Sequence, residues 1–146
     1  MRFMMLIIPK GYESQAPGFL PDTKNMEAMM QYNVSLGKAG VLLDLNGLQP
    51  PSVGGARITF KGGKPKVTDG PFTEAKEALG GYWMLQVKSK AEAVEWASRA
   101  PVAETDTIEL RQVFEMSDFG ADAHEVVEKF PETRAAAALN TLKSEA

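Results

Sequence analysis

The spacing of apolar residues predicts a chain built from four main strands and two main helices. Nearly every residue of 1–8 is apolar, which is typical of a strand that is covered on both faces. Within 93–100, apolar residues recur at the i, i+3, i+4, i+7 spacing of a helix, and Pro101 stops that helix. The expected strands span 1–8, 41–45, 80–87 and 107–114, and the expected helices span 23–38 and 89–100.

Both expected helices begin at residues that can cap them. Asp22 precedes the helix at 23–38 and can accept a hydrogen bond from its free backbone N–H groups. Ser89 and Glu92 have the spacing of a capping box at the start of the second helix. One face of the first helix is expected to pack in the core, and its residues are Met26, Met29, Met30, Val34 and Gly37.

A pair of short strands interrupts the main order. Residues 56–60 and 64–68 flank turn glycines and predict a β-hairpin, in which Pro65 favours an edge position. The segment 69–72 reads as a tight turn, and a short helical turn is expected at 73–77. Without the hairpin the order is β-α-β-β-α-β. This order predicts an α+β fold with a ferredoxin-like sheet, a hairpin insert, and both helices on one face.

Two helices cover only one face of such a sheet, yet its strands are apolar on both faces. The second face also carries polar residues, namely Tyr82, Gln86, Glu109 and Arg111, which suit a semi-polar interior. We therefore expect a second copy of the chain to cover this face and form a two-fold homodimer. The face expected at the interface bears Phe3, Met5, Tyr82 and Met84.

The C-terminal part of the chain differs from the rest. We expect a domain at 1–116 and a helical arm at 117–146, with helices at 118–129 and 132–143 separated by Phe130-Pro131. The alanine-rich end of the arm offers little apolar surface to bury. The arm is therefore expected to be separable from the domain.

Composition excludes several classes of function. The 146 residues include no Cys and one His, His124, which rules out disulfides, thiol nucleophiles and zinc–thiolate sites and leaves no two-His metal site. The net charge of -3 argues against direct nucleic-acid binding. No apolar run reaches the roughly 20 residues of a membrane span, and we expect a cytoplasmic protein. No phosphate-loop motif is present, and we expect no cofactor and no metal.

Four separated motifs carry a family resemblance. They lie at 46–51, 67–77, 79–83 and 109–116, and the second contains Asp69-Gly70-Pro71-Phe72. In this order they resemble the DGPF branch of the YCII-related proteins over about residues 1–120. The resemblance implies a dimeric α/β-barrel of ferredoxin-like units with no known reaction. It also implies a regulatory association, because members of this branch tend to be encoded beside extracytoplasmic-function sigma factors.

The best-studied YCII proteins carry a His–Asp pair in a cleft and are suspected enzymes. Here the helix at 23–38 has no His and offers Tyr32 and Asn33 instead. This departure weighs against His–Asp chemistry in the present chain. Asp69 is then the one acid that the motifs single out.

Five residues are candidates for a site. Asp69 reads either as turn chemistry or as a carboxylate that acts as a general base or ligand anchor. Arg57 and Arg111 lie on strands, where a planar guanidinium can hold an anionic group; pairing of Arg111 with Glu109 is the alternative. Tyr82 and Gln49 would orient the ligand.

Three functions remain open from the sequence. The first is a dimeric barrel that binds a small molecule, with a cofactor-free enzyme based on Asp69 as one form of it. The second is a regulatory or interaction module that engages a sigma-type regulator. The third is a structural dimer without chemistry, which the polar groups on the inner face weaken.

Overall fold

A computed structural model describes residues 1–133 of the chain. The chain divides into two compact units, 1–113 and 114–146.

The first unit is centred on a sheet in which neighbouring strands are antiparallel. Its strand order is β2-β5-β1-β6, with a hydrogen-bonded neighbour on both sides of β1 and β5. This arrangement is consistent with the predicted ferredoxin-like α+β fold, in which the strand after the insert returns between the first two. The strands span Arg2–Ile8 (β1), Leu42–Gly47 (β2), Gly81–Gln86 (β5) and Thr107–Gln112 (β6).

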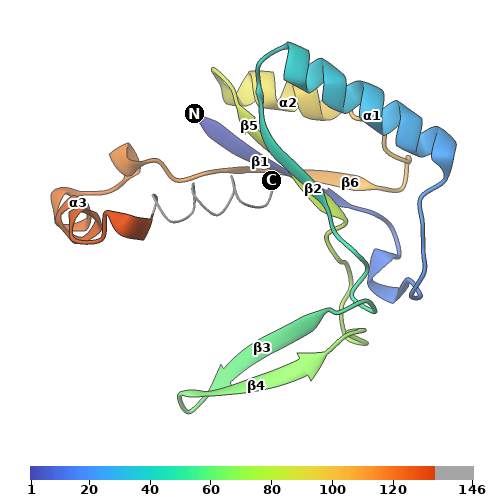
Figure 1. Ribbon diagram of the computed structural model, residues 1–146, viewed down its shortest axis with the longest axis horizontal. Coiled ribbons are helices and arrows are strands. Elements are labelled where there is room, and N and C mark those ends of the chain that lie inside the picture. The colour runs from blue at the N-terminus through green and yellow to red at the C-terminus, as the bar shows by residue number, and fades with distance from the viewer. Residues whose placement is uncertain (134–146) are drawn as a thin grey trace. The chain divides into compact units, whose positions relative to one another are not determined.

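Two helices cover one face of this sheet (Figure 1). They are α1 (Thr23–Lys38) and α2 (Lys90–Ser98), and both begin at the predicted caps. Asp22 Oδ1 accepts a hydrogen bond from the Lys24 N–H at 2.9 Å, and Ser89 Oγ accepts from the Glu92 N–H at 3.1 Å. The carboxylate of Glu92 accepts in turn from the Lys88 N–H at 2.8 Å. These contacts satisfy N–H groups that the helices themselves leave free.

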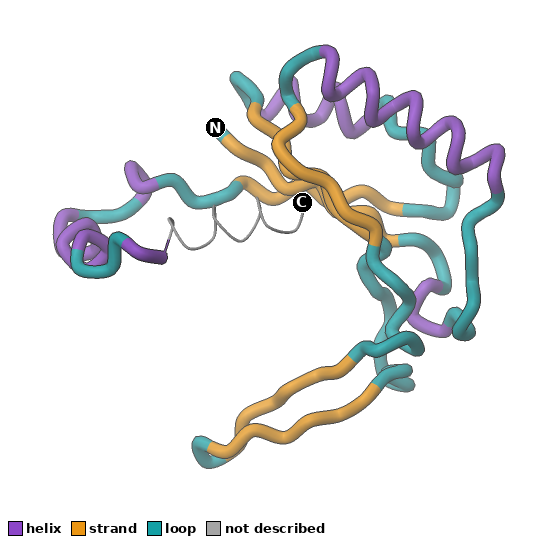
Figure 2. The backbone as a smooth tube through the Cα atoms, viewed as in Figure 1, coloured by secondary structure: helices purple, strands orange, loops and turns teal. Residues whose placement is uncertain are grey.

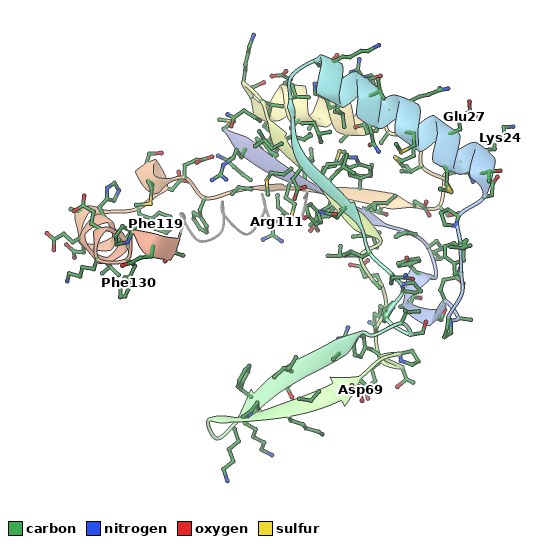
Figure 3. All side chains as sticks on the ribbon, viewed as in Figure 1. Lys24, Glu27, Asp69, Arg111, Phe119 and Phe130 are labelled. Atoms are coloured by element: carbon green, nitrogen blue, oxygen red, sulfur yellow. The ribbon has the colours of Figure 1, made fainter. Side chains whose placement is uncertain are left out.

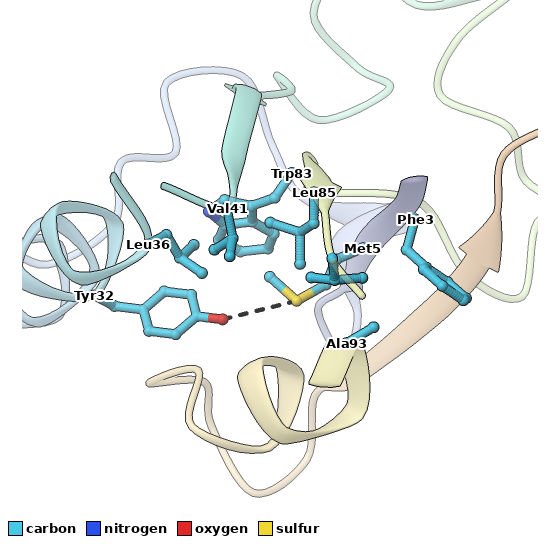
Figure 4. Close-up of a cluster of buried hydrophobic side chains, with 9 residues drawn as sticks. Phe3, Met5, Tyr32, Leu36, Val41, Trp83, Leu85 and Ala93 are labelled. Atoms are coloured by element: carbon cyan, nitrogen blue, oxygen red, sulfur yellow. Dashed lines mark hydrogen bonds between the residues drawn. The ribbon is translucent and has the colours of Figure 1, made fainter. Parts of the chain in front are cut away.

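The core lies between the helices and the sheet (Figure 4). Tyr32 and Leu36 of α1 are buried against Met5 and Leu85 of the sheet. The Tyr32 hydroxyl donates to the Trp96 carbonyl oxygen at 2.7 Å, so a polar group enters the core with its partner. Burial raises the pKa of Tyr32 to about 12, and the charge of Arg99 opposes that rise.

The predicted apolar face of α1 is confirmed at Met29 and wrong at Met26, Met30 and Val34. Met26, Met30 and Val34 are about half exposed, with exposed fractions of 47%, 61% and 51%. The helix instead buries Tyr32 and Leu36 and packs Met29 beside them. The Tyr32 hydroxyl has a carbonyl partner inside the core, so the tyrosine ring can be buried there in place of a methionine stripe.

The predicted grouping of residues on the sheet faces is wrong in one respect. Phe3 and Met5 pair across the strands with Leu85 and Trp83, and all four are buried on the helix-covered side. Tyr82 and Met84 lie on the opposite side. Directly paired residues share a face, so the register decides which alternating set of β1 accompanies Tyr82 and Met84, and that set is Met4 and Leu6.

A separate two-stranded hairpin projects from the main sheet (Figure 2). It consists of β3 (Ala56–Lys61) and β4 (Lys64–Asp69), as predicted. The residues of both strands are exposed along their whole length. The short helical turn expected at 73–77 is absent; only a turn closed by the Ala75 N–H and the Phe72 carbonyl oxygen at 3.0 Å forms there.

The described part of the second unit contains short helices. These are the 3-10 helix η2 (Met116–Asp118) and the α-helix α3 (Ala121–Glu128), which lies within the helix expected at 118–129. The rings of Phe114 and Phe119 lie 5.0 Å apart at their centroids. The second expected helix, at 132–143, falls almost entirely outside the described residues. Within residues 1–133, no helix has the length and apolar composition that crossing a membrane requires.

Candidate functional site

The sheet face opposite the helices carries a patterned surface, which we call the open face. Paired residues on the four strands form two adjacent rows across it. The middle of each row is apolar and partly buried, and the ends are polar and exposed. One row is Asn46, Tyr82, Leu6 and Glu109, and the next is Asp44, Met84, Met4 and Arg111.

Three polar side chains are hydrogen-bonded to one another at the β2 edge of the open face. The Tyr82 hydroxyl donates to Asp44 Oδ2 at 2.9 Å and accepts from Asn46 Nδ2 at 2.9 Å. Asp44 Oδ1 also accepts from the Leu45 N–H at 2.9 Å. Since the single O–H of Tyr82 is committed to Asp44, this group presents to a ligand the acceptor oxygens of Asp44 and the second N–H of the Asn46 amide.

A charged pair lies at the other edge, on β6. Arg111 Nη1 lies 3.7 Å from Glu109 Oε2, which is the mutual pairing that the sequence left as the alternative. The two side chains are 71% and 49% exposed. An exposed pair of this kind contributes at most about 1 kcal/mol, because water screens it. The guanidinium is therefore available to exchange Glu109 for an anionic ligand.

Two other predicted residues, Asp69 and Arg57, lie at the base of the hairpin. Asp69 is the last residue of β4 and is exposed, and its side chain makes no hydrogen bond or ion pair within residues 1–133. The Arg57 guanidinium lies over the ring of Phe72, 4.2 Å from its centroid. This stacking positions Arg57 against the turn that follows Asp69.

Glycines at the hairpin base allow backbones to approach closely. A Cβ at Gly70 would lie 2.0 Å from the Pro51 carbonyl oxygen, and one at Gly55 would lie 2.5 Å from the same atom. The Gly70 N–H donates to the Gly55 carbonyl oxygen at 2.7 Å. Close backbone packing therefore explains why the Asp-Gly-Pro-Phe motif has a glycine at position 70, independently of any role of Asp69.

A depression of ≈ 530 Å³ lies beside this turn. Its lining includes Glu13, Gln15, Pro71 and Phe72, but neither Asp69 nor Arg57. The lining carries one acidic side chain and no basic one, so it does not provide an anion site. Gln49 is exposed in the loop after β2 and does not line the depression either.

The structure thus divides the predicted residues between two places. Tyr82 and Arg111 share the open face, whereas Asp69 and Arg57 lie at the hairpin; Figure 3 shows Asp69 well away from Arg111. The sequence pattern did not predict Asp44 and Asn46 as site residues. The carboxylate of Asp44 within an otherwise apolar strand was the feature that could have indicated the site. No group of three or more metal-ligating side chains occurs in the described part of the chain.

Comparison with known proteins places the chain in a family. The model of the YCII-related domain matches residues 1–117. A protein of Rhizobium meliloti (strain 1021), itself named only as uncharacterized, is 31% identical over 74 residues, which are 51% of this chain and 56% of that protein. The chain thus spans little more than half the length of this curated relative. The family match covers most of the chain, and the chain belongs to the YCII-related domain family.

Proposed function

We propose that this chain is a homodimeric protein that binds a small organic acid on the open face of its sheet. The observation that carries the proposal is the hydrogen-bonded group of Tyr82, Asp44 and Asn46, which stands opposite Arg111 on a face that the helices of the first unit leave uncovered. We further propose that the chain belongs to the DGPF branch of its family and that the dimer is an α/β-barrel.

The open face favours a covering by a second copy. Met4, Leu6 and Met84 form an apolar strip between its two polar edges, and they are only partly buried in one chain. Apolar surface of this kind is favourably removed from water, by roughly 25 cal/mol per Å². A two-fold dimer that covers the open face of each copy would bury both strips and enclose the polar groups at their edges.

The polar edges define the chemistry of the ligand. Arg111 suits a carboxylate or phosphate, because its planar fork matches the two oxygens. The group at Tyr82 accepts hydrogen bonds and suits a hydroxyl or amino donor on the ligand. The β5 and β6 backbones stand roughly 10 Å apart, two strand spacings, with the apolar strip between them. The proposed ligand is therefore a small acid with an apolar body and a donor group at its other end.

An enzyme is one form of this proposal, with Asp69 as general base. Asp69 lies outside the open face of its own chain, so this role needs a second copy or a movement of the hairpin. Engagement of an extracytoplasmic-function sigma factor stays an expectation of the family resemblance. No feature of residues 1–133 favours it over the binding site.

Thermal-shift screening and calorimetry against small carboxylates and phosphates test the proposal. We expect at least one acid to stabilise the wild-type chain, and we expect Arg111→Gln to weaken its binding by roughly tenfold or more, the scale of a lost charge-assisted contact. Arg99→Gln is the matched control, because Arg99 follows α2 and lies over the Trp96 ring, away from the open face. Equal binding by wild type and Arg111→Gln, or no binding of any acid in the panel, would refute the site.

Sedimentation tests the dimer independently of the ligand. Met84→Lys places a charge in the middle of the apolar strip, and we expect it to dissociate the dimer at micromolar concentration. A wild-type chain that sediments as a monomer at that concentration would disprove the covering of the open face.

A further inference from the structure

The β3–β4 hairpin has two chemically different faces. Residues paired across its strands share a face, and one face is apolar: Ile58 pairs with Val67, and Phe60 pairs with Pro65. Ile58, Phe60 and Val67 are 51%, 74% and 63% exposed. The opposite face is basic and polar, and its residues are Arg57, Thr59, Lys61, Lys64, Lys66 and Thr68.

This hairpin has little to stabilise it within its own chain. A two-stranded hairpin alone is at best marginally stable in water, because its apolar face has nothing to pack on. Exposed apolar side chains on a projecting strand pair also invite association with other molecules. Burial of this apolar face against another molecule would therefore stabilise the hairpin.

The hairpin also carries a net positive charge, in contrast to the chain as a whole. It holds four of the chain's 16 Lys and Arg residues and one of its 19 Asp and Glu residues, Asp69. The chain as a whole has a net charge of -3. A second copy of this acidic chain is accordingly an electrostatically favourable partner for the hairpin.

The open face of the sheet complements the apolar face of the hairpin, because its middle is the apolar strip of Met4, Leu6 and Met84. The carboxylates of Asp44 and Glu109 at its edges add to the negative charge of the second copy, whereas the Lys and Arg residues lie on the hairpin face opposite the docked one. Figure 1 shows the hairpin projecting on the side of the sheet that faces away from α1 and α2, which is the side of the open face. The hairpin therefore lies on the same side of the sheet as the open face.

We propose that the β3–β4 hairpin is a dimerisation arm whose apolar face packs on the open face of a second copy of the chain. This inference rests on the dimer of the proposed function and names the hairpin as the partner segment that covers the apolar strip. Asp69 lies on the same hairpin face as Val67, directly across from Ala56, so docking carries its carboxylate to the partner subunit's sheet. The arm thereby brings together site residues that a single chain keeps apart.

Cross-linking between copies tests this placement directly, because the chain contains no Cys. Two differently tagged full-length preparations are mixed, one carrying Phe60→Cys and the other Met84→Cys, and a short bismaleimide is added. We expect a linked product that carries both tags. Thr59→Cys replaces Phe60→Cys in the matched control, since Thr59 lies on the opposite hairpin face, and we expect roughly fivefold less product from it.

Sedimentation supplies a readout that needs no cross-linker. Phe60→Ser removes the most exposed apolar group of the arm, and we expect it to raise the dimer dissociation constant roughly tenfold, the effect of about 1.4 kcal/mol. Thr59→Ser should leave the constant unchanged. Both variants alter exposed side chains, so the fold of the single chain should persist.

The outcomes separate this inference from the proposed function. If the wild type is dimeric and Met84→Lys dissociates it while Phe60→Ser has no effect and no mixed product forms, the arm is refuted and the dimer stands. If Phe60→Cys and Met84→Cys placed in one chain become linked within that chain, the hairpin folds on its own sheet and the arm is again refuted. A monomeric wild type overturns both proposals.

Discussion

Gly70→Ala is expected to destabilise the first unit through a backbone clash at the hairpin base. The new Cβ would lie 2.0 Å from the Pro51 carbonyl oxygen, 2.8 Å from the Pro51 carbonyl carbon and 3.3 Å from the Gly55 carbonyl oxygen. Carbon and oxygen atoms pack favourably only at about 3.5 Å or more. The hairpin base or the loop at Pro51 must therefore move by roughly 1 Å or more, and neither neighbour is a flexible side chain.

The size of the effect follows from two contributions. Overpacking of a tight backbone contact costs about 1–3 kcal/mol. The hydrogen bond from the Gly70 N–H to the Gly55 carbonyl oxygen, 2.7 Å long, would be strained or lost. A bond of this kind adds about 1 kcal/mol. We expect a loss of about 2–4 kcal/mol in the free energy of unfolding, which leaves a typical domain folded.

Urea denaturation of the full chain measures this loss, and Gly47→Ala is the matched control. A Cβ at Gly47 meets no atom within 4 Å, and its φ lies outside the left-handed region. We expect a change within about 0.5 kcal/mol there, or a slight gain. Hydrogen exchange at residue 70 locates the effect. If Gly70→Ala were as stable as wild type with the same exchange protection, the packing explanation of the motif would be wrong.

Three further predictions concern other parts of the chain. Burial raises the pKa of Tyr32 from 10.0 to about 12, so the contribution of its neutral hydroxyl to stability is complete below pH 10 and is lost as the pH rises towards 12. In urea titrations over that window, the free energy of unfolding of the wild type should fall by on the order of 2 kcal/mol more than that of Tyr32→Phe. Equal pH dependence of the two proteins would contradict this. Asp69→Asn should change the free energy of unfolding by at most about 1 kcal/mol, since the Asp69 side chain is exposed and has no partner within residues 1–133. The same variant should weaken ligand binding or turnover by roughly 10²-fold, and a variant that binds and turns over the ligand like wild type would show that Asp69 serves only the turn. A chain truncated after Met116 should still unfold cooperatively in circular dichroism, because the compact unit ends at residue 113, and a gradual transition would show that the arm belongs to the core.

The sequence by itself determined the order of the elements and most of their ends. Asp22 and Ser89 mark helix starts because short side-chain oxygens satisfy the free N–H groups of a first turn, and the structure shows both contacts. Alternation along β5 separated Trp83 from Tyr82, since successive residues of a strand point to opposite faces. These features depend on neighbours in the chain, and local sequence can therefore predict them.

Only the tertiary structure decided which faces belong together. The choice between Met5 and Met4 as the companion of Tyr82 depends on strand register, and a shift of one residue exchanges the faces. The burial of Tyr32 in place of Met30 depends on a carbonyl at Trp96, 64 residues along the chain. The joining of Asp44, Asn46 and Tyr82 likewise depends on the pairing of β2 with β5. Each contact is made by residues distant in sequence, and no pattern in one segment specifies the partner in another.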